Sequence, residues 1–266
     1  MTSSLKKFEG KKVLVTGASQ GIGEATALYF AEHGARVAIN GRNKETLELV
    51  LNKLPKVASG EHVIAAGDLS DEQDVLKVVK DSIESLDGLD ILICNAGFNG
   101  KSHPSEDYPL ADFEAVIKLN LYGVVIACQQ ALTYWLKANH KGVIVINSSV
   151  HQHIAKPGFL AYSASKGAIG NVVKTLGLEY ASRGIRVNAV APGAIVTPIN
   201  DAWIHDQKKV QEISDHIPLG RPGVSKEVAD AIGFLSGDES SYITGQTLYV
   251  DGGLTLYNDF AQNWSS

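Results

Sequence analysis

Short apolar segments alternate with longer amphipathic segments along almost the whole sequence. The apolar segments are five or six residues long, which suits buried strands, and the first is β-branched and closed by a glycine turn. Regular alternation of strands and helices implies right-handed crossovers and a parallel sheet covered by helices on both faces. The predicted strands are residues 12–16, 35–40, 62–66, 89–94, 142–147, 186–191 and 246–250.

The amphipathic segments at residues 23–32, 71–85 and 118–137 have helical spacing, and Ser, Thr or Asp precedes several of the helical segments, as expected of an N-cap. We therefore predict an α/β fold: one doubly wound Rossmann-type domain over residues 1–266, with a seven-stranded parallel sheet and helices on both faces. Residues 197–221 interrupt the alternation directly after a strand, at the sheet edge where ligands bind in such folds. This position predicts a substrate lid.

The composition, with 44% hydrophobic and 20% charged residues, is typical of a globular protein rather than a disordered chain. The net charge of −5 gives no electrostatic reason to expect nucleic acid or an acidic membrane as a partner. Because no segment resembles a signal peptide or a membrane span, we expect a cytoplasmic protein with no membrane partner. In that setting, Cys94 and Cys128 are expected to be buried free thiols.

Residues 16–23 read Thr-Gly-Ala-Ser-Gln-Gly-Ile-Gly and lie between the first predicted strand and the first helix. Glycines allow the backbone to turn tightly and to approach a pyrophosphate, and the following helix offers unpaired N–H groups to the anion. The spacing differs from the common Gly-x-Gly-x-x-Gly fingerprint, and a plain turn is the alternative. The placement favours dinucleotide binding. The candidate contacts are Gly17, Ser19, Gln20, Gly21, Ile22 and Gly23.

The end of the second strand bears on the choice between NAD and NADP. An NAD site usually has an acidic residue there, whereas this sequence has Arg42 and Asn43. The planar guanidinium of Arg42 suits the 2′-phosphate of NADP. We therefore predict NADP as the cofactor, with NAD as an alternative because Gln20, beside the glycine turn, is not basic.

Tyr162 and Lys166 are four residues apart at the start of an amphipathic segment, which places phenol and ammonium on one helical face. A tyrosine with an unperturbed pKa of about 10 is a poor base at neutral pH, and a nearby cation is expected to lower that pKa. Ser149 ends a predicted strand one loop earlier, where its hydroxyl can hydrogen-bond a reacting oxygen. The three residues predict a redox site.

Taken together, these motifs resemble the short-chain dehydrogenase/reductase family over residues 10–253. The resemblance implies that Tyr162 exchanges a proton with the substrate oxygen and that Ser149 orients that oxygen. It implies that Lys166 holds the nicotinamide ribose and lowers the pKa of Tyr162, and that Asn120 fixes a water in a proton relay. It implies no metal. Besides the glycine turn, the matching residues are Asp68, Leu69, Asn95, Ala96, Gly97, Asn120, Ser149, Tyr162, Lys166, Pro192 and Gly193.

The same resemblance supplies further cofactor contacts. Asp68 and the neighbouring Leu69 are expected near the adenine, and Asn95, Ala96 and Gly97 are expected to line the cofactor. Residues 192–197 are expected to flank the nicotinamide. Within that last segment the contacts are Pro192, Gly193, Ile195 and Thr197.

Within the family, four segments are similar to those of the sugar-oxidising glucose 1-dehydrogenases: residues 148–151, 197–200, 241–245 and 251–257. The likeness predicts oxidation of an aldose at C1, with Ser149, Tyr162, His151 and Asn99 contacting substrate. Asn99 stands where those enzymes carry glutamate, which argues for a polyhydroxy substrate more than for glucose itself.

Two alternatives remain open. One is an NADPH-dependent reductase of ketones, 3-oxoacyl groups or diketones, which needs a more apolar pocket. The other is an inactive dinucleotide-binding regulator, against which the complete catalytic set argues. The family likeness also implies a homotetramer, in which residues 254–266 form a tail packed on a neighbouring subunit.

Overall fold

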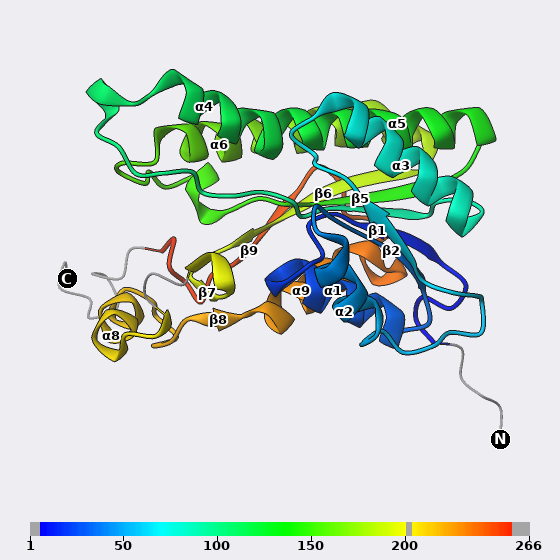
Figure 1. The fold of residues 1–266 in the computed structure, drawn as a ribbon, viewed down its shortest axis with the longest axis horizontal. Coiled ribbons are helices and arrows are strands. Elements are labelled where there is room, and N and C mark those ends of the chain that lie inside the picture. Colours follow the sequence, from blue (N-terminus) through cyan, green and yellow to red (C-terminus); the bar gives the residue numbers. More distant parts are fainter. Residues whose placement is uncertain (1–5, 201–203, 257–266) are drawn as a thin grey trace.

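The computed structural model describes residues 6–200 and 204–256, and it contains a seven-stranded parallel sheet with the order β3-β2-β1-β4-β5-β6-β9 (Figure 1). Each strand predicted from the sequence is present within two residues of its expected bounds, which confirms the predicted fold. The strands are β1 (Lys12–Val15), β2 (Arg36–Gly41), β3 (Val63–Ala66), β4 (Ile91–Cys94), β5 (Gly142–Asn147), β6 (Ile185–Pro192) and β9 (Thr247–Val250).

Helices cover both faces of this sheet (Figure 1). One face carries α3 (Glu72–Leu86), α4 (Leu110–Ile117), α5 (Val124–Ala138) and α6 (Leu160–Tyr180). The other face carries α1 (Gly21–Glu32), α2 (Lys44–Leu51) and α9 (Ser225–Ser236). No helix in the described part of the chain is long and apolar enough to cross a membrane.

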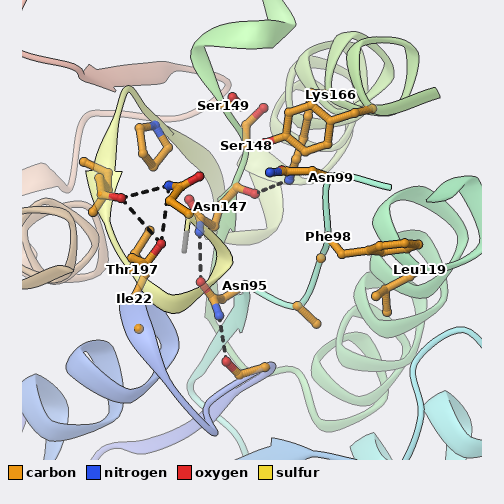
Figure 2. Close-up of a pocket in the computed structure, with 18 of the residues that line it drawn as sticks. Ile22, Asn95, Phe98, Asn99, Leu119, Asn147, Ser148, Ser149, Lys166 and Thr197 are labelled. Carbon is orange, nitrogen blue, oxygen red and sulfur yellow. Dashed lines mark hydrogen bonds between the residues drawn. The ribbon is translucent and has the colours of Figure 1, made fainter. Parts of the chain in front are cut away.

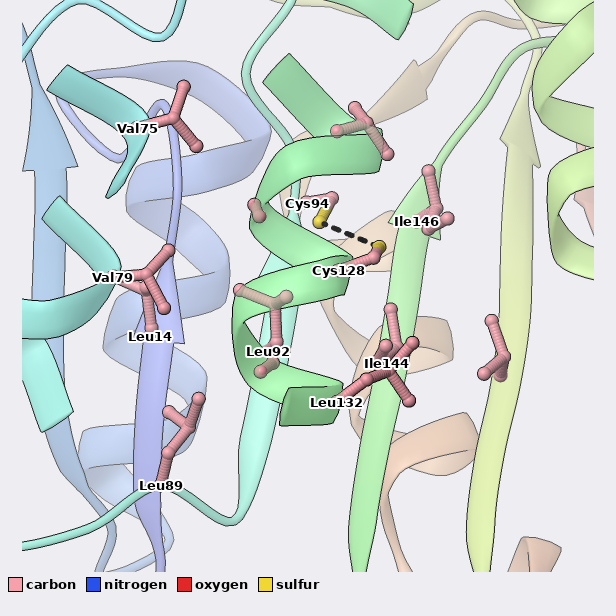
Figure 3. Packing of buried hydrophobic residues seen from close by; sticks show 14 of the residues in the cluster. Leu14, Val75, Val79, Leu89, Leu92, Cys94, Cys128, Leu132, Ile144 and Ile146 are labelled. Carbon is pink, nitrogen blue, oxygen red and sulfur yellow. Dashed lines mark hydrogen bonds between the residues drawn. The ribbon is translucent and has the colours of Figure 1, made fainter. Parts of the chain in front are cut away.

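Two hydrophobic clusters, one on each face of the sheet, form the core. The cluster under α3 and α5 contains Leu14, Leu92 and Ile144 together with both cysteines (Figure 3). The thiols of Cys94 and Cys128 are buried and free, as predicted, with 4.0 Å between their sulfur atoms. Their hydrogen bond, together with burial, raises the pKa of Cys94 well above its usual value, so the thiol stays protonated.

The prediction of one continuous helix over residues 118–137 is wrong, because the helical segment begins earlier and is interrupted. The helical segment begins at Leu110 with α4, passes through a π-helical turn at Lys118–Gly123 and continues as α5. Only Val116 of α4 is buried, so this part of the helix gives a weak apolar pattern. A π turn shifts the helical register by one residue, which periodicity alone does not reveal.

The strand order places β1 and β4 side by side at the centre of the sheet, where connections leave toward opposite faces. Such a switch point opens a crevice at the carboxyl ends of the strands. Beyond β6, the short strands β7 (Ile195–Val196) and β8 (Gly223–Val224) pair with each other, and α8 (Gln207–Asp215) lies between them in the chain. The segment predicted as a lid, residues 197–221, therefore includes a helix near this end of the sheet (Figure 1). Residues 201–203 of that segment, and 257–266 of the predicted tail, lie outside the described residues.

Candidate active site

A cavity of about 990 Å³ lies at the carboxyl ends of the strands and brings most of the predicted site residues together. Gly23, Asn43 and Asn120 do not line it. In the described part of the chain, no group of three or more His, Cys, Asp or Glu side chains is placed to hold a metal ion. The predicted site residues that line the cavity are Gly17, Ser19, Gln20, Gly21, Ile22, Arg42, Asp68, Leu69, Asn95, Ala96, Gly97, Asn99, Ser149, His151, Tyr162, Lys166, Pro192, Gly193, Ile195 and Thr197.

The glycine turn is built for close approach. Gly17 has a φ of 61°, and a Cβ atom there would lie 2.8 Å from the Cα of Ala96. A Cβ on Gly23 would collide with the carbonyl oxygen of Gly17, so this glycine is needed for packing of α1 against the turn. The side chain of Gln20, the N-cap residue, makes no hydrogen bond to the first N–H groups of α1. The turn therefore presents uncapped donors at a helix N-terminus toward the cavity, which fits an anion such as a pyrophosphate.

Asn95 holds this turn in place from the end of β4 (Figure 2). Its Nδ2 donates to the carbonyl oxygens of Thr16 and Gly17, each at 3.0 Å. Its Oδ1 accepts from Nδ2 of Asn147 at 2.8 Å. The amide is thus fixed by three partners, and Asn147, which sequence reasoning missed, joins the end of β5 to the turn.

Arg42 lines the outer edge of the cavity and is exposed, with no carboxylate from the end of β2 beside it. The neighbouring Asn43 is the N-cap of α2, because its side chain accepts from the backbone N–H of Thr46 at 3.1 Å. Asp68 lines the cavity as well, and its Oδ1 accepts from the backbone N–H and the hydroxyl of Ser70 at 3.0 and 2.9 Å. This edge therefore combines one guanidinium with one carboxylate that is held by its own loop.

Tyr162 and Lys166 lie one helical turn apart on α6, as predicted from their spacing. Nζ of Lys166 donates to the carbonyl oxygen of Asn147 at 2.8 Å and lies 5.7 Å from the centre of the Tyr162 ring. Only 5% of Lys166 is exposed, and burial lowers its pKa to about 8.

The expectation of a lowered pKa for Tyr162 is wrong. Burial raises the pKa of the phenol, and a hydrogen bond with Ser149 opposes that effect. Nζ of Lys166 lies 5.7 Å from the ring centre and, within the described part of the chain, donates to the carbonyl oxygen of Asn147 and makes no hydrogen bond to the Tyr162 hydroxyl. Desolvation therefore has the largest effect on the pKa of Tyr162.

Asn120 lies in the π turn and is buried behind the cavity wall. Its side chain pairs with the backbone of Phe98, accepting from the N–H at 3.0 Å and donating to the carbonyl at 2.9 Å. Nδ2 also lies 3.2 Å from the hydroxyl of Ser165, which donates to the carbonyl of Tyr162 at 2.8 Å. Asn120 therefore clamps the loop after β4 to the helix that carries Tyr162.

The space beside this clamp is kept open by Gly97. A Cβ atom there would lie 3.1 Å from Oδ1 of Asn120 and 3.8 Å from Nζ of Lys166. A side chain at this position would therefore take up space in front of the ammonium. Together with the uncapped helix and Arg42, this opening fits a bound dinucleotide cofactor.

The remaining predicted substrate contacts, His151 and Asn99, also line the cavity. Nδ1 of His151 lies 3.2 Å from the carbonyl oxygen of Ile154, and its ring centre is 6.0 Å from that of Tyr162. Asn99 points into the cavity near Ser148 and Lys166 (Figure 2). Lys156 and Ile213 also line the cavity and were not predicted, because Lys156 lies in the loop before α6 and Ile213 lies on α8, in a segment without a recognisable motif.

Comparisons with known proteins agree with this architecture. A family model described as enoyl-(acyl carrier protein) reductase matches residues 17–255. Glucose 1-dehydrogenase of Gluconobacter oxydans (strain 621H) is 63% identical over 260 residues, which cover 98% of this chain and 97% of the relative. The 3beta-hydroxysteroid dehydrogenase 1 of Eggerthella lenta is 40% identical over 253 residues, which cover 95% of this chain and 97% of the relative.

A solved structure has the same fold. The crystal structure of a levodione reductase superposes with a TM-score of 0.88 at 31% identity, covering 94% of this chain and 100% of that one. Since the family match and these relatives each span nearly the whole chain, the protein belongs to the short-chain dehydrogenase/reductase family of NAD(P)-dependent oxidoreductases acting on CH–OH groups.

Proposed function

We propose that this protein is an NADP-preferring aldose dehydrogenase that oxidises a sugar at C1. The observation that carries the proposal is the set of polar groups around Tyr162, with Ser149, Lys166 and His151 on one wall of the cavity, in a chain 63% identical to a glucose 1-dehydrogenase. A sugar needs several convergent polar groups to orient it, and this wall supplies them.

In this proposal, Tyr162 takes the proton of the C1 hydroxyl, and the hydroxyl of Ser149 donates to the reacting oxygen and holds it in place. NADP⁺ held in the cavity would supply the acceptor for the C1 hydride, and loss of that hydride together with the hydroxyl proton would convert the hemiacetal to a lactone. Lys166, whose Nζ lies 5.7 Å from the centre of the Tyr162 ring, would hold the ribose of the nicotinamide and supply positive charge beside Tyr162. Asn120 acts by positioning α6 through Ser165.

Arg42 supports the preference for NADP. It is the basic side chain at the cavity edge next to the end of β2, where an NAD-specific site would place a carboxylate. A guanidinium offers paired donors to a 2′-phosphate, so NADP gains a charged contact that NAD lacks.

A second candidate function is reduction of an apolar carbonyl compound. Phe98, Leu119, Ile213 and Leu254 line the same cavity, and the 40% identical relative is named for a hydroxysteroid. An apolar substrate would contact these side chains and would offer no hydrogen-bond partner to Nε2 of His151.

Assembly as a homotetramer extends the proposal. Large apolar side chains are exposed on α6 and around β9, among them Leu178 at 84% and Tyr242 at 103% exposure. Contact with other subunits would cover them. Light scattering on the purified protein tests this part separately.

The test of the main proposal mixes purified protein with NADP⁺ or NAD⁺ and a panel of aldoses, polyols and secondary alcohols, and follows absorbance of the reduced nicotinamide. Turnover of an aldose with a higher kcat/KM for NADP⁺ than for NAD⁺ is the expected result. Activity confined to NADPH-driven reduction of ketones or diketones would establish the second candidate instead.

A further inference from the structure

Lys156 lies in the loop before α6, and its half-buried side chain lines the cavity beside Tyr162. Its Nζ is 4.2 Å from the centre of the Phe159 ring and 5.4 Å from the centre of the Tyr162 ring. Within the described part of the chain it forms no ion pair. The ammonium is therefore held over two aromatic faces and has protons left to donate.

The surroundings of Lys156 disfavour an isolated charge. Burial lowers the pKa of Lys156, and its proximity helps to lower the pKa of His151, on which burial has the larger effect. A ligand that fills this side of the cavity would remove water from the half-buried ammonium, and a ligand oxygen placed there would replace that water as the acceptor. The cavity wall thus contains a cationic donor that makes no hydrogen bond to a protein group in the described part of the chain.

His151 supplies the complementary group. Its lowered pKa keeps the ring neutral at neutral pH, and a proton on Nδ1 satisfies the carbonyl of Ile154. Nε2 then accepts. A hydroxyl group both donates and accepts, so neighbouring hydroxyls on one substrate can serve Lys156 and His151 together.

We propose that Lys156 is a specificity-determining residue that donates a hydrogen bond to a ring hydroxyl of the substrate, beside the hydroxyl that Tyr162 deprotonates. This inference rests on the proposed function and narrows the substrate class to polyhydroxylated compounds. An apolar ketone or alcohol would bury the ammonium without an acceptor and would be rejected for that reason.

The experiment compares wild type with Lys156→Met on D-glucose and on its 2-deoxy, 3-deoxy and 6-deoxy analogues, each with NADP⁺. Lys156→Met is expected to lower kcat/KM for glucose about 10- to 100-fold, mainly through a higher KM. For the 2-deoxy analogue, which lacks the ring hydroxyl beside C1, wild type and variant should agree within about threefold. Lys156→Gln, which keeps an N–H donor without charge, should lose less on glucose.

A structural role for Lys156 would lower kcat/KM by the same factor for every sugar, and that outcome, like an unchanged kcat/KM for glucose, overturns the inference. NADPH affinity and the melting temperature report whether Lys156→Met is folded. If it is not folded, Lys156→Gln is compared with wild type on the same four sugars instead. Lys80→Met, at an exposed position on α3, is the matched control and should leave all four sugars unaffected. Wild-type protein that oxidises no aldose would overturn the proposed function itself, which distinguishes the two failures.

Discussion

Asn147 donates from Nδ2 to Oδ1 of Asn95 at 2.8 Å, while its own carbonyl accepts from Nζ of Lys166 at 2.8 Å. One residue at the end of β5 therefore contacts both the lysine beside Tyr162 and the asparagine that holds the glycine turn (Figure 2). The contact also fixes which way the Asn95 amide points, because its oxygen faces Asn147 and its nitrogen faces the carbonyls of Thr16 and Gly17. The two halves of the cavity are thus linked by adjacent hydrogen bonds.

Replacing Asn147 by Leu should weaken cofactor binding. The substitution keeps the backbone carbonyl that Lys166 uses but leaves Oδ1 of Asn95 without its donor, which frees the amide to rotate and loosens the turn. We expect the Kd for NADPH to rise about 5- to 20-fold, measured by nicotinamide fluorescence. An NADPH affinity equal to that of wild type would show that the turn does not depend on this contact.

Replacing Arg42 by Ala should change the choice of cofactor. The variant loses the cation at the cavity edge, so the Kd for NADPH is expected to rise about 10- to 100-fold while the Kd for NADH changes less than about threefold. Titration of both cofactors by fluorescence tests this directly. Equal effects on the two cofactors would contradict recognition of the 2′-phosphate.

Replacing Tyr162 by Phe should abolish turnover and leave NADPH binding nearly intact, because the ring stays and only the proton-transferring hydroxyl is lost. The expected loss in kcat is about 100- to 10,000-fold. Steady-state kinetics and NADPH titration on the same preparation measure the two properties together. Wild-type turnover by the purified variant would exclude the proposed mechanism.

The rate of sugar oxidation should rise with pH. Burial raises the pKa of Tyr162 above its ordinary 10.0, so the phenolate is a minor species at neutral pH and grows about tenfold per pH unit below that pKa. The hydrogen bond with Ser149 lowers this pKa, so Ser149→Ala should move the basic inflection of kcat/KM to higher pH. Profiles of kcat/KM for both proteins from pH 6 to pH 11 test this prediction. A profile that falls with pH throughout would contradict Tyr162 as the base.

Replacing Gly23 by Ala should destabilise the protein and impair NADPH binding, because the new methyl group would collide with the Gly17 carbonyl inside the turn. We expect a loss of about 1–3 kcal/mol in the free energy of unfolding. Gly167→Ala is the matched control, since a Cβ there meets no atom within 4 Å and Ala stabilises a helix by about 0.5–1 kcal/mol relative to Gly. Chemical denaturation measures both, and equal stabilities for the two variants would contradict the packing role of Gly23.

The sequence by itself determined the layered fold. Strands 12–16 and 142–147 were recognisable because a parallel strand buried on both faces must be apolar throughout, whereas helices that cover the sheet must be apolar on one side. The Tyr162–Lys166 pair followed in the same way, since a spacing of four residues sets one helical face. Patterns of this kind involve residues close in sequence, so the geometry of a single strand or helix is enough to predict which face each side chain occupies.

Only the tertiary structure determined which residues of the site contact one another and how deeply they are buried. No periodic pattern encodes the π turn at Lys118–Gly123 or the contact between Asn147 and Asn95, which lie 52 residues apart. The position of Lys156 over the Tyr162 ring depends on the path of the loop before α6. The pKa of Tyr162 is the clearest case, because the spacing to Lys166 predicted a lowered value and burial raises it. Desolvation depends on everything packed around a group, and that packing exists only once the chain has folded.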